Sequence, residues 1–466
     1  MTTLDVINPA SGQRVARVPI DDPARIRAKA RGARTAQPDW AAVPLRRRQE
    51  IIARFRQLIE EQTERLSILL TTEMGKPIRQ SRNELKSLLE RIDFFLAETP
   101  RTLRSETVWD DEATGTVERI TREPLGVVAN ISAWNYPYFV GANVFLPALL
   151  TGNAVLYKPS EFVPQTGLAI TELLHESGVP PEVFAAVIGP GEAGATLLRQ
   201  GLDGVFFTGS HPTGQRIAKA IAGRSIKLQL ELGGKDPAYV CDDVDAATAA
   251  ESLADGAFYN TGQSCCSVER IYVHRSVWAP FLEAFTAIVK AFPAGDPRDE
   301  ATYIGPVTRP AQLEVLEAQL ADARHKGAKV HLRGRVPRGR GNYFAPTVLT
   351  AVSHDMQVMR AESFGPIIGL MKVDDDEQAV ELMNDTHYGL TAGVYSRDRS
   401  RAEAILSRTN AGSVYWNCCD RVSPRLPWSG RNDSGVGLTL SREGILTFTR
   451  PKAWHLRRMN DGPPAV

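Results

Sequence analysis

The sequence predicts an α/β protein whose main sheet is parallel and carries helices on both faces. Between residues 125 and 232, short apolar runs alternate with helical segments. A strand, a helix and a strand repeated in this way are typical of a doubly wound parallel sheet. After Gly233 the alternation resumes with a helix near 245–259, a strand at 268–274 and further strands and helices. A second α/β lobe is therefore expected.

The individual elements follow from apolar spacing. Residues 22–100 are predicted to be helical, because apolar side chains recur at helical spacing through EIIARFRQLIEEQTERLSILL and the pattern ends at Gly75 and Pro77. The predicted strands of the main sheet are, in chain order, LGVVANI, AVLYK, VFAAVI, GVFFTG and IKLQLEL. The predicted helices between them are YFVGANVFLPALL, QTGLAITELLHES, EAGATLLRQ and TGQRIAKAIA.

The composition favours a small-molecule partner. The chain has 466 residues, 43% hydrophobic and 23% charged, and 55 basic against 54 acidic side chains leave a net charge of +1. A near-zero net charge gives no general electrostatic case for binding nucleic acid or a membrane surface. The apolar stretch from Tyr138 to Leu150 is shorter than the roughly 20 residues that cross a membrane. We expect no nucleic acid and no membrane partner.

Cysteine usage and the N-terminal segment favour a reducing, cytoplasmic location. Five cysteines, at 241, 265, 266, 418 and 419, form an odd set with two adjacent pairs, which is a poor disulfide framework. The segment MTTLDVINPASGQRV lacks the basic and apolar regions of a secretory signal. No cysteine or histidine spacing matches a metal site, so no metal is expected.

Lys158 and Glu161 follow a predicted strand in the segment YKPSE, near the carboxyl edge of the sheet. Ligands of open α/β sheets bind at that edge. A carboxylate there can accept hydrogen bonds from ribose hydroxyls and repels a 2′-phosphate, so Glu161 favours NAD over NADP. The competing interpretation is that Lys158 and Glu161 are solvent-exposed loop residues without a binding role.

Two glycine-containing turns follow later strands. GPGEAG, beginning at Gly189, matches G-x-G-x-x-G, but it follows the third strand and lacks the usual acidic residue, so we interpret it as a turn near the cofactor. In FTGS, Gly209 allows close backbone approach, and Ser210 is a good helix N-cap beside a site for pyrophosphate. A purely structural turn has the same pattern.

Glu231 and Cys265 are the candidate reactive side chains. Glu231 ends a predicted core strand before two glycines, where partial burial would raise its pKa and suit it to act as a general base. Cys265 lies on a loop between a helix and a strand, a position suited to a nucleophile. The alternative for Glu231 is a buried structural ion pair. The alternative for Cys265 is the role of a small buried hydrophobic residue. The other four cysteines are expected to be structural.

Taken in order, these motifs resemble the aldehyde dehydrogenase superfamily over nearly the whole chain. The matching segments are INPASGQ, EMGKP, REPLGVV, WNYP, KPSE, FTGS, ELGGK, FYNTGQSC, ESFGP, NDTHYGLTAGV and the late SGVG. The ordered pair of ELGGK and F-x-N-x-G-Q-x-C is highly specific. The chain departs from the common pattern at Ala361, and also at PWSGRNDSG, where Trp428, Ser429 and Arg431 replace the usual residues.

The resemblance implies a set of site residues. Cys265 would be the nucleophile, Glu231 the general base and Asn135 of WNYP the side-chain donor of the oxyanion hole. The implied NAD site comprises Ile131, Ser132, Trp134, Lys158, Ser160, Glu161, Gly189, Phe207, Thr208, Gly209, Ser210, Leu232, Gly233, Glu362 and Phe364. NADP is the less favoured cofactor.

The resemblance also implies three domains. A Rossmann-like NAD-binding domain would span 1–103 and 125–232, a second α/β catalytic domain 233–445, and a small β oligomerisation arm 104–124 and 446–466. The implied assembly is a homodimer or homotetramer.

The implied reaction is NAD-dependent oxidation of an aldehyde to a carboxylic acid through a cysteine thiohemiacetal and thioester, which glutamate-activated water hydrolyses. Transfer of the acyl group to coenzyme A, a cysteine hydrolase and an inactive scaffold are the alternatives. The aldehyde itself is left open: Tyr138, Phe139, Phe258, Tyr259 and residues 416–421 suggest an apolar tunnel, whereas Arg421 or Arg425 would suit a semialdehyde carboxylate.

Overall fold

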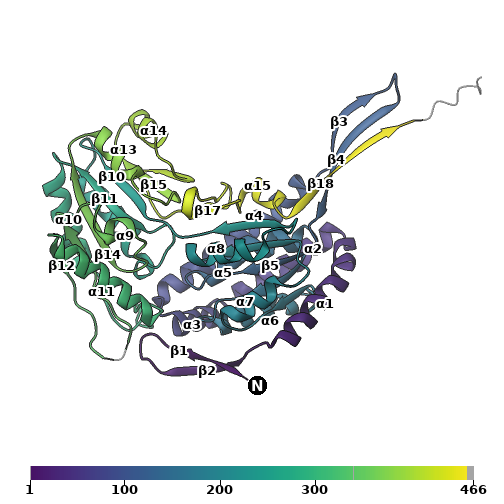
Figure 1. The fold of residues 1–466 in the computed structure, drawn as a ribbon, viewed down its shortest axis with the longest axis horizontal. Coiled ribbons are helices and arrows are strands. Elements are labelled where there is room, and N and C mark those ends of the chain that lie inside the picture. The colour runs from purple at the N-terminus through teal and green to yellow at the C-terminus, as the bar shows by residue number, and fades with distance from the viewer. Residues whose placement is uncertain (1, 340, 459–466) are drawn as a thin grey trace, which may run out of the picture.

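The computed structural model describes residues 2–339 and 341–458 and consists of two α/β lobes with a projecting β arm (Figure 1). The first sheet has the order β17-β9-β8-β5-β6-β7, and all pairs except β17–β9 are parallel. Its strands are β5 (Val127–Ile131), β6 (Ala154–Lys158), β7 (Phe184–Ala186), β8 (Gly204–Thr208), β9 (Lys227–Glu231) and β17 (Gly435–Val436). The predicted parallel sheet is confirmed.

Helices cover both faces of this sheet because its strands are apolar on both sides. One face packs on α2 (Leu45–Glu61), α3 (Thr63–Met74), α4 (Ile78–Thr102), α5 (Pro137–Leu150) and α6 (Pro164–Glu176). The other face packs on α1 (Pro23–Ala42), α7 (Gly191–Leu198) and α8 (His211–Ile221). The hairpin of β1 (Thr3–Ile7) and β2 (Arg14–Pro19) lies beside this lobe. This arrangement is the doubly wound fold.

The second lobe is built on a seven-stranded sheet with the order β12-β13-β14-β11-β10-β15-β16. Its strands are β10 (Asp236–Val240), β11 (Val268–His274), β12 (Lys329–Arg333), β13 (Thr347–Thr350), β14 (Ile367–Val373), β15 (Thr391–Tyr395) and β16 (Ser413–Trp416). The helices are α9 (Ala246–Phe258), α10 (Trp278–Ala291), α11 (Pro310–His325), α12 (Gln357–Arg360), α13 (Asp376–Asn384) and α14 (Arg399–Leu406). Helices α9 and α10 pack on one face, and the others on the opposite face.

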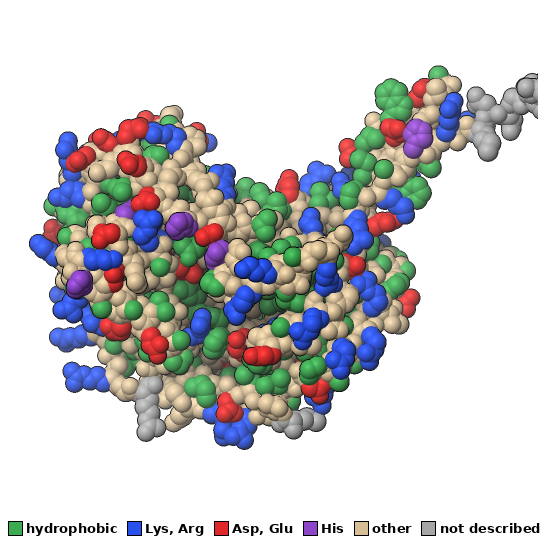
Figure 2. All heavy atoms as spheres, viewed as in Figure 1, with side chains coloured by type: hydrophobic (Ala, Val, Ile, Leu, Met, Phe, Trp, Pro, Cys, Tyr) green, Lys and Arg blue, Asp and Glu red, His purple; other side chains and the backbone are tan. Residues whose placement is uncertain are grey.

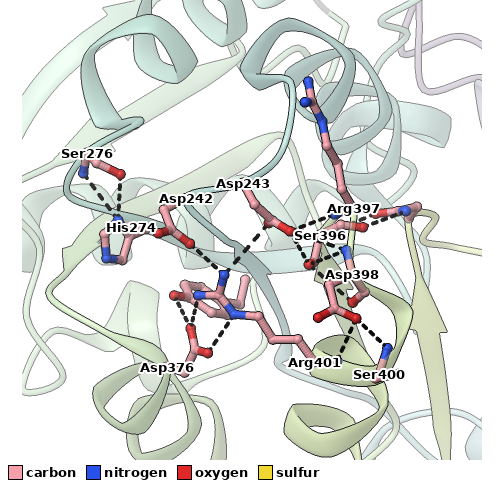
Figure 3. Close-up of polar contacts among 12 residues, drawn as sticks. Asp242, Asp243, His274, Ser276, Asp376, Ser396, Arg397, Asp398, Ser400 and Arg401 are labelled. Carbon is pink, nitrogen blue, oxygen red and sulfur yellow. Dashed lines mark hydrogen bonds and ion pairs between the residues drawn. The ribbon is translucent and has the colours of Figure 1, made fainter.

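Arg401 of α14 holds one end of the second lobe together (Figure 3). Its guanidinium donates two hydrogen bonds to the Asp376 carboxylate, at 2.7 and 2.6 Å, and one to Asp242, at 2.6 Å. The neighbouring Asp243 carboxylate accepts from the Ser396 hydroxyl at 2.8 Å. These contacts tie the loop after β10 to α13 and α14. The cluster contains none of the predicted site residues and is structural.

A three-stranded antiparallel sheet forms the arm, which extends away from both lobes (Figure 1). It consists of β3 (Glu106–Asp111), β4 (Thr116–Pro124) and β18 (Thr449–Arg457), in the order β18-β4-β3. The predicted pairing of the segment 104–124 with the C-terminal strand therefore occurs. Residues 459–466 of the predicted arm lie outside the described residues.

The segment before the arm differs from the predicted domain boundary. The resemblance implies a second lobe that spans residues 233–445, but β17 pairs with β9 of the first sheet. Helix α15 (Ser441–Leu446) also packs on the first lobe, since its Ile445 belongs to the core cluster of that lobe. The chain thus returns to the first sheet well before the arm.

Charge is dispersed on the face of the molecule that Figure 2 shows. On the face shown in Figure 2, acidic and basic side chains are interspersed, in keeping with the net charge of +1. Among the helices of the described residues, none is long and apolar enough to cross a membrane.

Candidate active site

Four parallel strands bring predicted site residues to one edge of the first sheet. In the strand register, Ile131 lies opposite Lys158 and opposite Phe207, and Thr208 lies opposite Glu231. The carboxyl ends of β5, β6, β8 and β9 therefore align. The sheet order also reverses between β5 and β8, and such a switch point is where open α/β sheets bind ligands.

The loop that carries Cys265 is placed against this edge by an unusual backbone. Asn260, Thr261 and Gly262, in the 3₁₀ turn η1 (Tyr259–Gly262), all have positive φ, at 54°, 57° and 69°. A Cβ on Gly234 would stand 2.8 Å from the carbonyl oxygen of Cys265. Only glycine permits this approach, so the ELGGK segment and the cysteine loop meet through backbone contact.

Glu231 is buried, with 3% of its surface exposed, at the end of β9. Burial raises the pKa of its carboxyl group to about 7, although the Trp428 indole N–H, the Arg91 charge and the Thr208 hydroxyl each lower it. The Trp428 Nε1 donates to Glu231 Oε1 at 2.6 Å. A carboxyl group with this pKa is divided between acid and base near neutral pH, which suits proton transfer.

Cys265 is partly exposed, whereas its neighbour Cys266 is buried. A hydrogen bond with Cys266 lowers the pKa of the Cys265 thiol, but burial and the carboxylates of Glu231, Asp236 and Asp420 raise it above its ordinary value overall. Cys266 is buried as predicted, yet it is not purely apolar, because its thiol donates to Asp420 Oδ1 at 2.9 Å. The resting thiol therefore needs a base or a nearby positive charge to become a thiolate.

Asn135 is buried beside the cysteine loop, and its Nδ2 donates to the carbonyl of Gln263 at 3.1 Å. An amide nitrogen has two hydrogens, so one donor remains for an oxyanion. Sequence reasoning missed the pair that supports this residue. Lys76 and Glu84 form a fully buried ion pair, and Lys76 Nζ donates to the Asn135 carbonyl at 2.8 Å. Lys76 lies in EMGKP, one of the segments that match the family, for which the sequence predicted no site residue.

Lys158 and Glu161 have the geometry of a hydroxyl-binding pair. Lys158 is buried, and burial lowers its pKa while the Glu161 charge raises it. Its Nζ lies 3.7 Å from Glu161 Oε2 and 3.4 Å from the Pro159 carbonyl. Both contacts are long for hydrogen bonds of an ammonium group. Ribose hydroxyls bound between Lys158 and Glu161 would form hydrogen bonds with both side chains.

The start of α8 leaves backbone donors at the same edge. Ser210 occupies the N-cap position as predicted, but its side chain makes no capping hydrogen bond and instead contacts the Thr213 hydroxyl at 3.2 Å. The helix also begins at His211, two residues before the predicted segment TGQRIAKAIA. Uncapped N–H groups at a helix start favour an anion such as pyrophosphate. These features fit a dinucleotide.

Glu362 and Phe364 of the second lobe reach the first sheet. A Cβ on Gly233 would overlap the Glu362 carboxylate, and Gly234 N donates to Glu362 Oε1 at 3.2 Å. The Phe364 ring lies 5.3 Å from the Trp134 ring in an edge-on arrangement. The loop is held by Glu269, whose carboxylate accepts from the backbone N–H of Phe364 at 3.0 Å. Sequence reasoning did not single out Glu269.

Three of the predicted tunnel residues are wrong. Tyr138 is fully buried and donates to the Leu66 carbonyl, and Phe258 packs in the core of the second lobe against Phe285 and Phe292. The Trp416 indole instead donates to the Ser396 carbonyl beside the Arg401 cluster.

Tyr136 was missed, although it follows Asn135 directly. Its ring stacks on Phe139 at 4.8 Å and lies 3.7 Å from Lys76 Nζ. Arg421 and Arg425, the two predicted carboxylate anchors, are both exposed. Neither therefore has the buried setting expected of an anchor.

Metal ligation has no support in the part of the chain that the structure describes, where no group of three histidine, cysteine or acidic side chains could hold an ion. A parallel sheet with a cysteine loop and a buried carboxylate at its switch point instead defines an α/β enzyme of the dinucleotide-binding class.

Comparison with known proteins gives the family. Residues 1–454 match the model of the aldehyde dehydrogenase family. The chain is 35% identical over 441 residues to a betaine aldehyde dehydrogenase of Rhizobium leguminosarum bv. trifolii, covering 94% of this chain and 90% of the relative. It is 34% identical over 448 residues to the succinate-semialdehyde dehydrogenase [NADP(+)] of Deinococcus radiodurans, covering 96% and 93%.

Solved structures agree with this result. The crystal structure of lactaldehyde dehydrogenase from Escherichia coli superimposes with a TM-score of 0.94 at 31% identity, covering 98% of this chain and 96% of the other. The chain belongs to the aldehyde dehydrogenase family and is an NAD(P)-dependent aldehyde oxidoreductase.

Proposed function

We propose that this enzyme oxidises an aldehyde to its carboxylic acid by covalent catalysis at Cys265, with Glu231 as the base that activates water. One observation supports this above the others: a Cβ on Gly234 would stand 2.8 Å from the Cys265 carbonyl oxygen, so the cysteine loop packs against the segment that follows Glu231. Asn135 donates to the Gln263 carbonyl of the same loop at 3.1 Å.

The reaction begins when the Cys265 thiolate adds to the aldehyde carbon and forms a thiohemiacetal. The second N–H of Asn135 and a backbone N–H stabilise the oxyanion. NAD, when bound, accepts the hydride. Glu231 then takes a proton from water, the hydroxide attacks the resulting thioester, and the acid and the free thiol are released. In sum, aldehyde, NAD⁺ and water give the carboxylate, NADH and two protons.

Hydrolysis distinguishes this proposal from acyl transfer to coenzyme A. Glu231 stands buried and hydrogen-bonded at the site, and a water-activating base is needed only for hydrolysis. With aldehyde, NAD and coenzyme A all present, we expect the free acid as the product. Formation of the acyl thioester of coenzyme A would contradict the proposal, and absence of NADH would favour a cysteine hydrolase or a scaffold.

We further propose a preference for NAD over NADP. The Glu161 carboxylate beside Lys158 would meet a 2′-phosphate with like charge. The expected result is a higher kcat/KM with NAD, and Glu161→Ala should narrow the difference by about tenfold, which corresponds to about 1.4 kcal/mol. Glu172→Ala, which removes an exposed carboxylate of α6, should leave the ratio unchanged. Since the Deinococcus relative is named for NADP(+), a preference for NADP is a real alternative outcome and would refute the assignment.

For the substrate, we propose a medium-sized apolar or aromatic aldehyde. Trp134, Phe139, Cys265 and Val422 are partly buried and pack against the same apolar core cluster, which favours an apolar substrate. Benzaldehyde should therefore be oxidised with a higher kcat/KM than succinic semialdehyde. Arg421→Ala should not change that ratio, because Arg421 is exposed. Among the described residues, its side chain makes one hydrogen bond, from Nη1 to the carbonyl of the adjacent Asp420 at 3.3 Å.

Arg91 supports a second candidate, a semialdehyde that bears a carboxylate. Arg91 is 3% exposed, and its guanidinium donates to Asn143 Oδ1 at 2.7 Å and to the Val422 carbonyl at 3.2 Å. No carboxylate of the described residues pairs with it within 4.0 Å. A preference for succinic semialdehyde that collapses in Arg91→Met and persists in Arg421→Ala would establish this candidate over the apolar one.

The arm is proposed to join copies of the chain in a homodimer or homotetramer. Val108, Trp109 and Leu456 expose 48%, 57% and 44% of their surfaces on it. Exposed apolar side chains beside open strand edges are typical of pairing surfaces. Light scattering of the purified protein should give two or four times the 51.1 kDa chain mass, and a monomer would contradict the proposal.

The five unpaired cysteines favour a reducing compartment, for which we propose the cytoplasm.

A further inference from the structure

The general base has a hydrogen-bond partner that its own strand does not supply. Trp428 Nε1 donates to Glu231 Oε1 at 2.6 Å, and each residue is 3% exposed. Trp428 lies in PWSG, one of the segments where this chain departs from the common family pattern. A phenylalanine at this position could fill much of the same space, but it could not donate a hydrogen bond.

The backbone holds both partners at the same sheet edge. Trp428 and Thr439 exchange two backbone hydrogen bonds, at 2.8 and 3.0 Å, which hold the backbone of Trp428 in place. Strand β17 pairs Gly435 with Glu231, and Leu232 N donates to the Ser434 carbonyl at 3.0 Å. The segment that carries the donor is therefore bonded to the strand that carries the acceptor.

An indole N–H only donates, so it favours the ionised carboxylate over the neutral acid. The other groups that act on the Glu231 carboxylate are the Arg91 guanidinium of α4, the Thr208 hydroxyl of β8 and the thiol of Cys265. Among these groups only Arg91 is a cation. Trp428 thus provides a direct hydrogen bond, at 2.6 Å, that partly offsets the burial of this base.

We propose that Trp428 is a positioning residue for the general base: its indole N–H fixes the Glu231 carboxylate and favours its ionised form for hydrolysis of the thioester. This inference rests on the proposed function of Glu231. Trp428 itself takes no part in bond making or breaking, and its effect should appear in the hydrolytic step rather than in acylation.

The test is Trp428→Phe, which removes the N–H and retains an aromatic ring. Loss of a donor to the carboxylate raises the pKa of Glu231, so the acid limb of the pH profile of kcat should move to higher pH, by about one to two units. At pH 7, kcat should fall about tenfold or more, while the first turnover still releases about one NADH per active site. An acid limb that coincides with that of the parent enzyme would overturn the proposal.

Trp40→Phe is a matched control. Trp40 is also 3% exposed and donates its indole N–H to a backbone carbonyl, that of Leu149, at 3.0 Å. It should show a comparable loss of thermal stability with the pH profile of the parent. If Trp428→Phe does not fold, replacement of Trp428 by 3-benzothienylalanine, which has the shape of indole without the N–H, provides the same measurement.

A double variant separates this inference from the proposed function. In Glu231→Gln, adding Trp428→Phe should not lower the steady rate further, because the partner of the indole is already changed. If Glu231→Gln abolishes steady turnover and Trp428→Phe leaves the pH profile unchanged, only the positioning role fails. If Glu231→Gln turns over at the parent rate, the proposed function of Glu231 fails instead.

Discussion

Cys265→Ala should abolish NADH formation from aldehyde, with a loss of at least about 10⁴-fold in kcat, because the covalent route has no other nucleophile. Binding of NAD should be retained, since the predicted cofactor residues lie on the sheet edge and the ESFGP loop. Stopped-flow absorbance of NADH measures the first effect, and titration of the protein with NAD measures the second.

Cys266→Ala is the matched control for this variant. Cys266 is adjacent, yet its side chain is buried and its thiol donates to Asp420. Its removal should leave kcat within about tenfold of the parent, because the nucleophile remains in place. Comparable turnover in Cys265→Ala, or equal losses in the two variants, would contradict the assignment of the nucleophile.

Glu231→Gln should separate acylation from hydrolysis. The variant should release a burst of about one NADH per active site and then stall, with the steady rate reduced by about 10²- to 10⁴-fold, because the thioester has lost its base. Rapid-quench or stopped-flow measurement resolves the two phases. Loss of the burst itself would instead indicate that Glu231 activates the Cys265 thiol.

The same carboxylate sets the expected pH dependence of the parent enzyme. Burial raises the pKa of Glu231 to about 7, and only the ionised form can take a proton from water. The steady rate should therefore fall as the pH drops below about 7, and the residual rate of Glu231→Gln should lack this limb. A parent profile that is flat between about pH 5 and pH 8 would contradict the role of this group.

Much of the first lobe could be predicted because its strands are short apolar runs separated by clear turns. The strands that end at Ile131, Lys158, Thr208 and Glu231 all occur where alternation placed them. Strand β10 was missed for a local reason: it contains Pro237, which lacks the N–H that a central strand normally donates. The structure accommodates it with a register shift between Asp236 and Pro237.

By itself, the sequence determined the family and the short motifs with their reactive side chains, since a strand end, a glycine turn and a cysteine loop are local patterns. Only the tertiary structure decided which distant residues meet. Trp428 reaches Glu231 across 197 positions, and Lys76 reaches Asn135 across 59, and no periodicity encodes such contacts. The face of α5 was equally undetermined. Nearly every residue of that helix is buried, so apolar spacing could not distinguish Tyr138, which packs in the core, from Phe139, which is partly exposed.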